Sequence, residues 1–129
     1  MVILCFLILL GPHVLVTSSP DGCLSDGTVI SAQKISNSYG ALSSFYTPEG
    51  SDTFGLSPSS LGDLDGDGVV DLVVGAYLDD DGGTYAGAVY ILFLTTDGLT
   101  KSAQKISNSY GGLSSFYTLD SYDHFCPHF

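Results

Sequence analysis

Acidic side chains gather in one short stretch of the chain, residues 61–77, which reads LGDLDGDGVVDLVVGAY. Its aspartates stand at positions 1, 3, 5 and 9 of a loop, as Asp63, Asp65, Asp67 and Asp71. Calcium prefers six to eight hard oxygen ligands, and carboxylates at alternate positions of a tight turn can all point inward. The glycines between them allow the positive φ angles with which a chain wraps an ion. The stretch therefore predicts a calcium-binding loop.

A plain polar turn and an EF-hand are two other interpretations of this loop, and neither accounts for its sequence. A polar hairpin turn also favours Asp and Gly, but it does not need four aspartates in this register. An EF-hand needs a bidentate Glu at position 12 and a helix on each side, whereas position 12 is Val74. Residues 69–74 are rich in Val and strand-like. We therefore predict that the loop joins two strands of a β-hairpin, with the backbone carbonyl of Val69 at position 7 as a further ligand.

Composition limits the fold and the partners. The 129 residues contain 44% hydrophobic residues, enough for the core of a small domain. The formal net charge of −11 argues against nucleic acid or an anionic membrane surface as a partner. Thirteen of the 14 acids are Asp, which favours turns and ion loops over helices. With 16 Gly and 8 Tyr, the chain is predicted to be all-β.

One segment of the chain occurs twice. Residues 31–47 (SAQKISNSYGALSSFYT) recur 71 positions later as residues 102–118, and 16 of the 17 positions are identical. The one difference is Ala41 against Gly112. Such self-similarity is typical of stacked repeats, in which each unit buries its face on the next. We predict an outer strand near Gln33–Ile35 and a turn at Tyr39 and Gly40 in the first copy.

Short motifs around the aspartate loop resemble one FG-GAP repeat, the repeat of integrin α-subunit heads. They are Phe54-Gly55 before the loop, then Gly75-Ala76-Tyr77, then Gly87-Ala88-Val89-Tyr90. Tyr77 stands where the family usually has Pro. The resemblance covers about residues 54–94. It implies a four-stranded antiparallel blade of an incomplete β-propeller, with calcium bound in the hairpin between two strands.

Besides the strand at residues 69–74, which follows the aspartate loop, a second strand is predicted at residues 86–94. The run from Ala88 to Leu94 is apolar at successive positions, as expected of a strand covered on both faces. Residues 79–83 (DDDGG) link the two strands. We expect their carboxylates to be solvated; a partner or a second ion is the alternative.

The pattern divides the chain into four parts. Residues 1–19 are predicted to be a signal peptide, because the apolar run Val2–Leu10 is too short for a bilayer span. That segment has no Lys or Arg, and a rival interpretation makes Val2–Leu7 part of an upstream strand. Residues 20–53 would be a partial repeat. Residues 54–118 would be a blade with the calcium loop and the repeated segment, and residues 119–129 a truncated start of the next repeat.

The remaining candidates for chemistry are weak. His124, Cys126 and His128 alternate and could share a face, but a zinc site lacks a fourth ligand there. Cys23 and Cys126 could form a disulfide if the first residues are removed. No nucleophile and base stand out together, so we expect no catalytic residues and no enzyme.

The aspartate loop predicts calcium binding, and the resemblance to FG-GAP repeats implies an extracellular propeller module, secreted or at the cell surface, that binds protein or glycan ligands and serves cell adhesion. The resemblance also allows an accessory propeller of a secreted hydrolase whose catalytic domain is not in this chain. A gene fragment without a function of its own is a third possibility. The expected partners include further blades of a longer chain or a second copy. No membrane span and no nucleic acid are expected.

Overall fold

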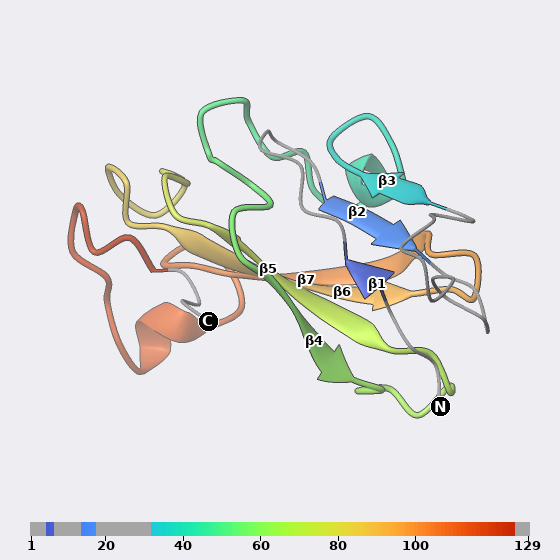
Figure 1. Cartoon of the computed structure of the whole chain (residues 1–129). Coiled ribbons are helices and arrows are strands. Elements are labelled where there is room, and N and C mark those ends of the chain that lie inside the picture. Colours follow the sequence, from blue (N-terminus) through green and yellow to red (C-terminus); the bar gives the residue numbers. More distant parts are fainter. Residues whose placement is uncertain (1–4, 7–13, 18–31, 126–129) are drawn as a thin grey trace.

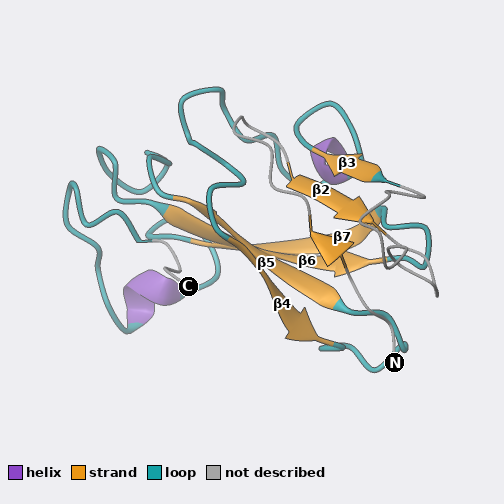
Figure 2. Ribbon diagram, viewed as in Figure 1, coloured by secondary structure: helices purple, strands orange, loops and turns teal. Residues whose placement is uncertain are grey.

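The computed structural model describes residues 5–6, 14–17 and 32–125. It contains β-strands and two short 3₁₀ helices (Figures 1 and 2). The elements in chain order are β1 (Cys5–Phe6), β2 (Val14–Thr17), β3 (Gln33–Ile35), η1 (Leu42–Ser44), β4 (Pro58–Gly62), β5 (Asp71–Ala76), β6 (Ala88–Leu94), β7 (Thr100–Ile106) and η2 (Leu113–Ser115). In this described part of the chain, no helix has the length and apolar character needed to cross a bilayer.

The last four strands form one antiparallel sheet in the order β4-β5-β6-β7, each strand paired with the next in sequence. This arrangement confirms the all-β prediction and the four-stranded antiparallel blade that the resemblance implies. The aspartate loop joins β4 to β5, so the predicted hairpin is also confirmed. β5 begins at Asp71 rather than Val69, because the amide of Val69 donates to Asp67 Oδ1 within the loop.

The inner and outer strands of this sheet differ in composition. Every residue of β5 is buried, and β6 is buried except at Ile91 and Phe93, which are half-buried. The edge strands β4 (PSSLG) and β7 (TKSAQKI) are polar and largely exposed or half-buried. Polar edges protect a sheet from pairing with other chains, while apolar β-branched residues stabilise its centre.

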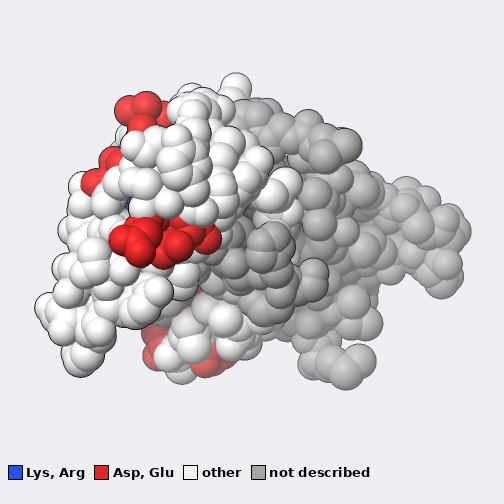
Figure 3. Space-filling view, turned by 90° about the vertical axis from the view of Figure 1, so that its left-hand side faces the viewer, with Lys and Arg blue, Asp and Glu red and all other residues white. Residues whose placement is uncertain are grey.

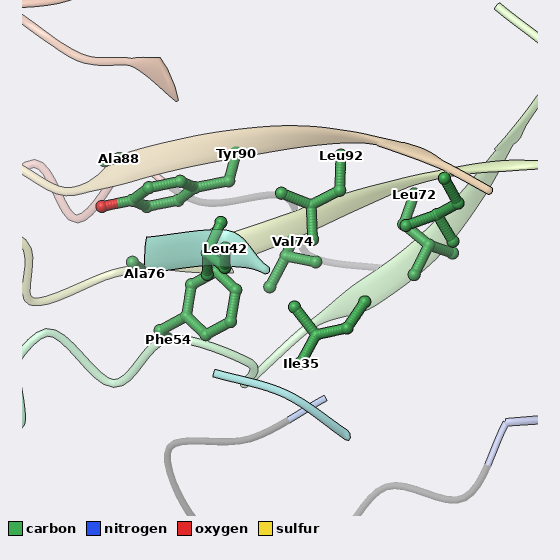
Figure 4. Close-up of a cluster of buried hydrophobic side chains, with 10 residues drawn as sticks. Ile35, Leu42, Phe54, Leu72, Val74, Ala76, Ala88, Tyr90 and Leu92 are labelled. Carbon is green, nitrogen blue, oxygen red and sulfur yellow. The ribbon is translucent and has the colours of Figure 1, made fainter. Parts of the chain in front are cut away.

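One face of the sheet forms the core of the molecule. The cross-strand pairs Leu72–Leu92, Val74–Tyr90 and Ala76–Ala88 lie on this face and are fully buried. Ile35 of β3 and Leu42 of η1 cover it, together with Phe54 (Figure 4). The opposite face is less well covered, which differs from the prediction that β6 is buried on both sides. Elements packed on the first face come from the first copy of the repeated segment.

The smaller sheet, β1-β2-β3, has the same pairing register as β5-β6-β7. Its pairs are Phe6–Val16, Val16–Gln33 and Val14–Ile35, which correspond to Val73–Ile91, Ile91–Gln104 and Val89–Ile106. The short sheet thus repeats the last three strands of the larger one. β1 and β2 fall within residues 1–19; the signal peptide assigned to that range remains a prediction, as does the rest of the four-part division.

The two copies of the repeated segment adopt the same backbone. The predicted outer strand is β3, and its counterpart Gln104–Ile106 ends β7. Paired backbone hydrogen bonds close the turn that follows, between Ser36 and Tyr39 in the first copy and between Ser107 and Tyr110 in the second. The one substituted position is left-handed in both copies, with φ of 63° at Ala41 and 72° at Gly112. Gly is therefore the less strained residue there.

Leu42 and Leu113 occupy the same position of the two copies, so they form a matched pair for a stability test. Leu42 is fully buried on the sheet, whereas Leu113 is half-buried. We expect Leu42→Ala to lower the free energy of unfolding by about 2–4 kcal/mol, through lost burial and a residual cavity. Leu113→Ala should lower it by less than about 1 kcal/mol. Urea unfolding in dilute solution measures both, and equal losses would contradict this packing.

Candidate metal centre

Three carboxylates of the aspartate loop come together in the folded chain. Asp63, Asp65 and Asp71 each offer one oxygen, and these oxygens lie within 4.8 Å of one another. Asp63 and Asp65 are exposed, whereas Asp71 is buried at the start of β5. Carboxylate oxygens at this spacing can share one hard cation, because an ion between them offsets their mutual repulsion.

Asp63 organises the loop around this point. Its Oδ1 accepts hydrogen bonds from the amides of Gly66 and Asp67, at 2.7 and 3.0 Å, and its Oδ2 accepts one from Gly68 at 2.8 Å. Gly66 and Gly68 have φ of 79° and 87°, the left-handed values that the sequence predicts for them. The loop is thus folded around the Asp63 carboxylate, and Oδ2 keeps a lone pair for a ligand.

Asp71 connects the loop to the interior of the sheet. Its side chain is fully buried, and its Oδ2 accepts the amide of Leu64 at 2.8 Å. Its Oδ1 accepts the amide of Leu94, at the end of β6, at 3.1 Å. A buried carboxylate requires such partners, because an unsatisfied charge in the interior is strongly destabilising. Asp71 therefore fixes the aspartate loop against β6.

Asp67, the fourth predicted ligand, lies outside the group of three and contacts Lys101 of β7. Lys101 Nζ bridges the loop, at 2.8 Å from Asp65 Oδ2 and in direct contact with Asp67 Oδ2. The hydrogen bond from Lys101 and then that from the Val69 amide lower the pKa of Asp67. The hydrogen bonds with Asp65 and Asp67 raise the pKa of Lys101. An ammonium group thus lies between two carboxylates of the loop, of which Asp65 belongs to the group of three.

The structure therefore brings together three of the four predicted aspartates. The ligand roles of all five predicted residues remain predictions: Asp63, Asp65, Asp67, Asp71 and, through its carbonyl, Val69. Sequence reasoning missed Lys101, which is 34 residues from Asp67 and reaches the loop only because β7 pairs with β6. The available signal is the scarcity of cations: the chain has three Lys or Arg residues against 14 acids, which favours ion pairing of a lysine.

A second polar cluster lies at the other end of the sheet and was also missed. Lys105 of β7 is buried, and its Nζ lies 2.6 Å from Asp79 Oδ2 and contacts Asp81 as well. Tyr90 of β6 donates its hydroxyl to Asp79 Oδ2 at 3.1 Å. The expectation that residues 79–83 form a solvated acidic loop is therefore wrong for Asp79, which is 1% exposed. Asp80 and Asp81 are exposed, as expected.

Burial and hydrogen bonding have opposing effects on pKa values in and near this cluster. Burial alone would lower the pKa of Lys105, but the hydrogen bonds with Asp79 and Asp81 outweigh it and raise that pKa. Burial, reinforced by the charge of Asp79, raises the pKa of Tyr90. Burial also raises the pKa of the nearby Asp52 to about 6, against the lowering effect of the hydrogen bond from the Glu49 amide. The cluster holds one cation among several acids and is structural in character.

Acidic groups dominate the surface near this end of the molecule. Figure 3 shows this side of the described chain, where Asp and Glu atoms form several separate patches and hardly any Lys or Arg atoms are visible. This distribution agrees with the formal net charge of −11. It opposes association with polyanions.

Of the residues proposed for a zinc site or a disulfide, the structure describes only His124. His124 Nδ1 lies 3.1 Å from the carbonyl oxygen of Tyr77, and the two rings are 5.5 Å apart. His124 is therefore engaged within the chain. Cys126, His128 and Cys23 lie outside the described residues, so both alternatives remain untested.

Comparison with known families gives one match. The family model described as the FG-GAP repeat matches residues 54–92, which span the aspartate hairpin, β5 and most of β6. No curated protein and no solved structure matches the chain. The matched range includes every aspartate of the loop and ends before Lys101 and Lys105.

The raised pKa of Asp52 makes stability depend on pH. Between its ordinary value of 3.8 and about 6, the folded chain holds a proton on Asp52 that the unfolded chain releases. This contribution to stability is therefore lost as pH rises through the window. We expect the free energy of unfolding of Asp52→Asn, relative to that of the wild type, to rise between pH 4 and pH 7 by about 1–2 kcal/mol, since solvent screening reduces the effect. Urea unfolding in calcium-free buffer measures this difference.

Asp123 provides the matched control for this test. Its Oδ2 accepts the amide of Asp120 at 2.8 Å, just as Asp52 Oδ2 accepts that of Glu49 at 2.7 Å. Asp123 is exposed, so Asp123→Asn removes a carboxylate with the same hydrogen bond but without the burial. An Asp52→Asn variant with the pH dependence of the wild type would show that burial does not perturb this carboxyl group.

Proposed function

Residues 54–92 form an FG-GAP repeat, and on this premise we propose that the chain is a calcium-stabilised β-propeller module with a role in extracellular binding and adhesion. The observation that carries the calcium proposal is the convergence of Asp63, Asp65 and Asp71 to within 4.8 Å in the hairpin of that repeat. Asp67 and the carbonyl of Val69 would complete the set. Five ligands plus water give the oxygen-rich coordination that calcium prefers.

The role of calcium in this proposal is structural. The carboxylates come from both ends of the loop, and Asp71 is tied to the end of β6 through the amide of Leu94. An ion at this point would hold β4, β5 and β6 together at one end of the sheet. Calcium lowers the pKa of bound water much less than zinc does, so it is a poor source of hydroxide. We therefore propose no catalytic role for the site.

The proposed location follows from the ion and from the family. Calcium sites of moderate affinity are filled where calcium is in the millimolar range, as it is outside cells. FG-GAP repeats are typical of extracellular proteins, and the acidic surface excludes polyanions as favoured partners. A protein or glycan ligand fits this module best. The calcium site would stabilise the sheet that presents the binding loops.

Asp65 gives the most direct test of calcium binding. Its carboxylate contacts Lys101 and is exposed, so Asp65→Asn should remove a ligand without disturbing the loop backbone. We expect calorimetric titration of the full chain to show one calcium bound, with affinity reduced about tenfold or more in the variant. Asp97→Asn is the matched control, because Asp97 is an exposed aspartate of the β6–β7 turn. Equal affinities in the two variants would contradict the proposal.

Lys101 gives an independent test, because calcium must displace its ammonium group from Asp65 and Asp67. Exposed ion pairs are weak, so removing this competing pair should raise the calcium affinity only modestly, roughly two- to fivefold. We therefore expect Lys101→Met to bind calcium more tightly. Lys34→Met changes the net charge equally at a distant site and should leave the affinity nearly unchanged. Weaker binding in Lys101→Met would show that the lysine supports the site.

A further inference from the structure

The two copies of the repeated segment have nearly the same sequence and backbone but different surroundings. Residues 31–47 and 102–118 differ at one position in 17. The first copy packs on the β5–β6 face of the larger sheet, whereas the second lies beyond β7 and covers no sheet in the described part of the chain. The first copy therefore shows which surface such a segment fits.

Tyr46 is central to the packing of the first copy. Its ring meets Tyr90 of β6 edge-on at 5.8 Å and Tyr110 of the turn after β7 at 5.7 Å. Lys105 Nζ lies over both rings, 5.3 Å from the centre of Tyr90 and 5.2 Å from that of Tyr110. We call the surface that receives Tyr46 its seat; it consists of the rings of Tyr90 and Tyr110 and the ammonium group of Lys105. Edge-to-face rings and cation–π contacts both stabilise such an arrangement.

The second copy presents the same side chains to solvent. Tyr117, the counterpart of Tyr46, is 61% exposed, and Phe116 is 92% exposed compared with 41% for Phe45. The segment from residue 102 to 118 contains no acid and one lysine, in a chain with 14 acids. An uncharged aromatic surface on an otherwise acidic chain is suited to burial against another surface.

The chain also carries a second turn with the tyrosine and the lysine of the seat that receives Tyr46; the position of Tyr90, which pairs with Lys105, is taken there by Leu15, which pairs with Lys34. Tyr39, the counterpart of Tyr110, is 58% exposed, and Lys34 Nζ lies 4.8 Å from the centre of its ring. The strand before this turn, β3, belongs to the β1–β3 sheet, whose register repeats that of β5–β7. Each molecule therefore holds both halves of one interface: an exposed segment at residues 113–117 and an exposed seat around Tyr39.

We propose that these two surfaces bind each other between copies of the chain, in a head-to-tail arrangement. Tyr117 of one copy lies against Tyr39 of the next, as Tyr46 lies against Tyr110 within one copy. The interface is heterologous, so repeated association leads to a closed ring or an open chain of molecules. The contact adds sheets in the order in which they already stack within the chain. It uses neither the aspartate loop nor its ion.

Light scattering and sedimentation of the full chain in millimolar calcium test this proposal. We expect the wild type to associate with rising concentration, and Tyr117→Ala or Phe116→Ala to weaken association about tenfold, as is typical of a central aromatic contact. Tyr39→Ala should weaken it to the same degree. Both tyrosines are exposed, so urea unfolding of these variants at low concentration should match the wild type. Tyr46→Ala is the matched control: it should lower the free energy of unfolding independently of concentration.

Mixing the variants makes the test sharper. Tyr117→Ala keeps the seat and Tyr39→Ala keeps the segment, so a mixture can form one interface and then stop. At a concentration where the wild type is about half associated, we expect one-to-one dimers in the mixture and mostly monomers in each variant alone. A monomeric wild type at all concentrations up to about 100 μM would overturn the proposal and assign the surface to a different chain. Association that survives in Tyr117→Ala and Tyr39→Ala, or a mixture without dimers, would also overturn it.

Discussion

The buried carboxylate of Asp71 is the interaction on which the rest of the sheet depends. It is fully buried, accepts the amide of Leu64 from the aspartate loop and accepts the amide of Leu94 from the end of β6. The charge is tolerated in the interior because both oxygens have donors. The same carboxylate faces Asp63 and Asp65, so the sheet is built around a point of concentrated negative charge. A cation there would relieve this repulsion and strengthen the links between three strands.

Covering the apolar sheet faces is the second constraint. The face formed by Leu72, Val74 and Tyr90 is closed by residues that come from the segment before the sheet, Ile35 and Leu42 among them. A four-stranded sheet with apolar inner strands needs such a cover, because most of its stabilisation comes from buried apolar area. The recurrence of this segment after β7 places the same side chains where a following sheet would need them. The residues that cover the sheet and the carboxylates of the proposed calcium site are thus separate sets.

The local patterns could be predicted from the sequence, and the contacts between distant residues could not. The aspartate register predicted the hairpin, and the repeat predicted the outer strand Gln33–Ile35, because each depends on residues close together in the chain. Lys101 and Lys105 escaped prediction because their partners lie 34 and 24 residues away and meet them only across the sheet. In the sequence, nothing distinguishes Asp79 from its exposed neighbour Asp80, because both belong to the same acidic run. Its burial depends on Tyr90 and Lys105, which the sequence does not place beside it.

A crystal structure determined with calcium tests the central claim most directly, because it shows the ion and its ligands. We expect density for one ion at about 2.3–2.6 Å from carboxylate oxygens of Asp63, Asp65 and Asp71, the range typical of calcium. Lys101 Nζ, now 2.8 Å from Asp65 Oδ2, should have moved away from the loop. A loop without an ion at saturating calcium, with Lys101 still between Asp65 and Asp67, would contradict the claim.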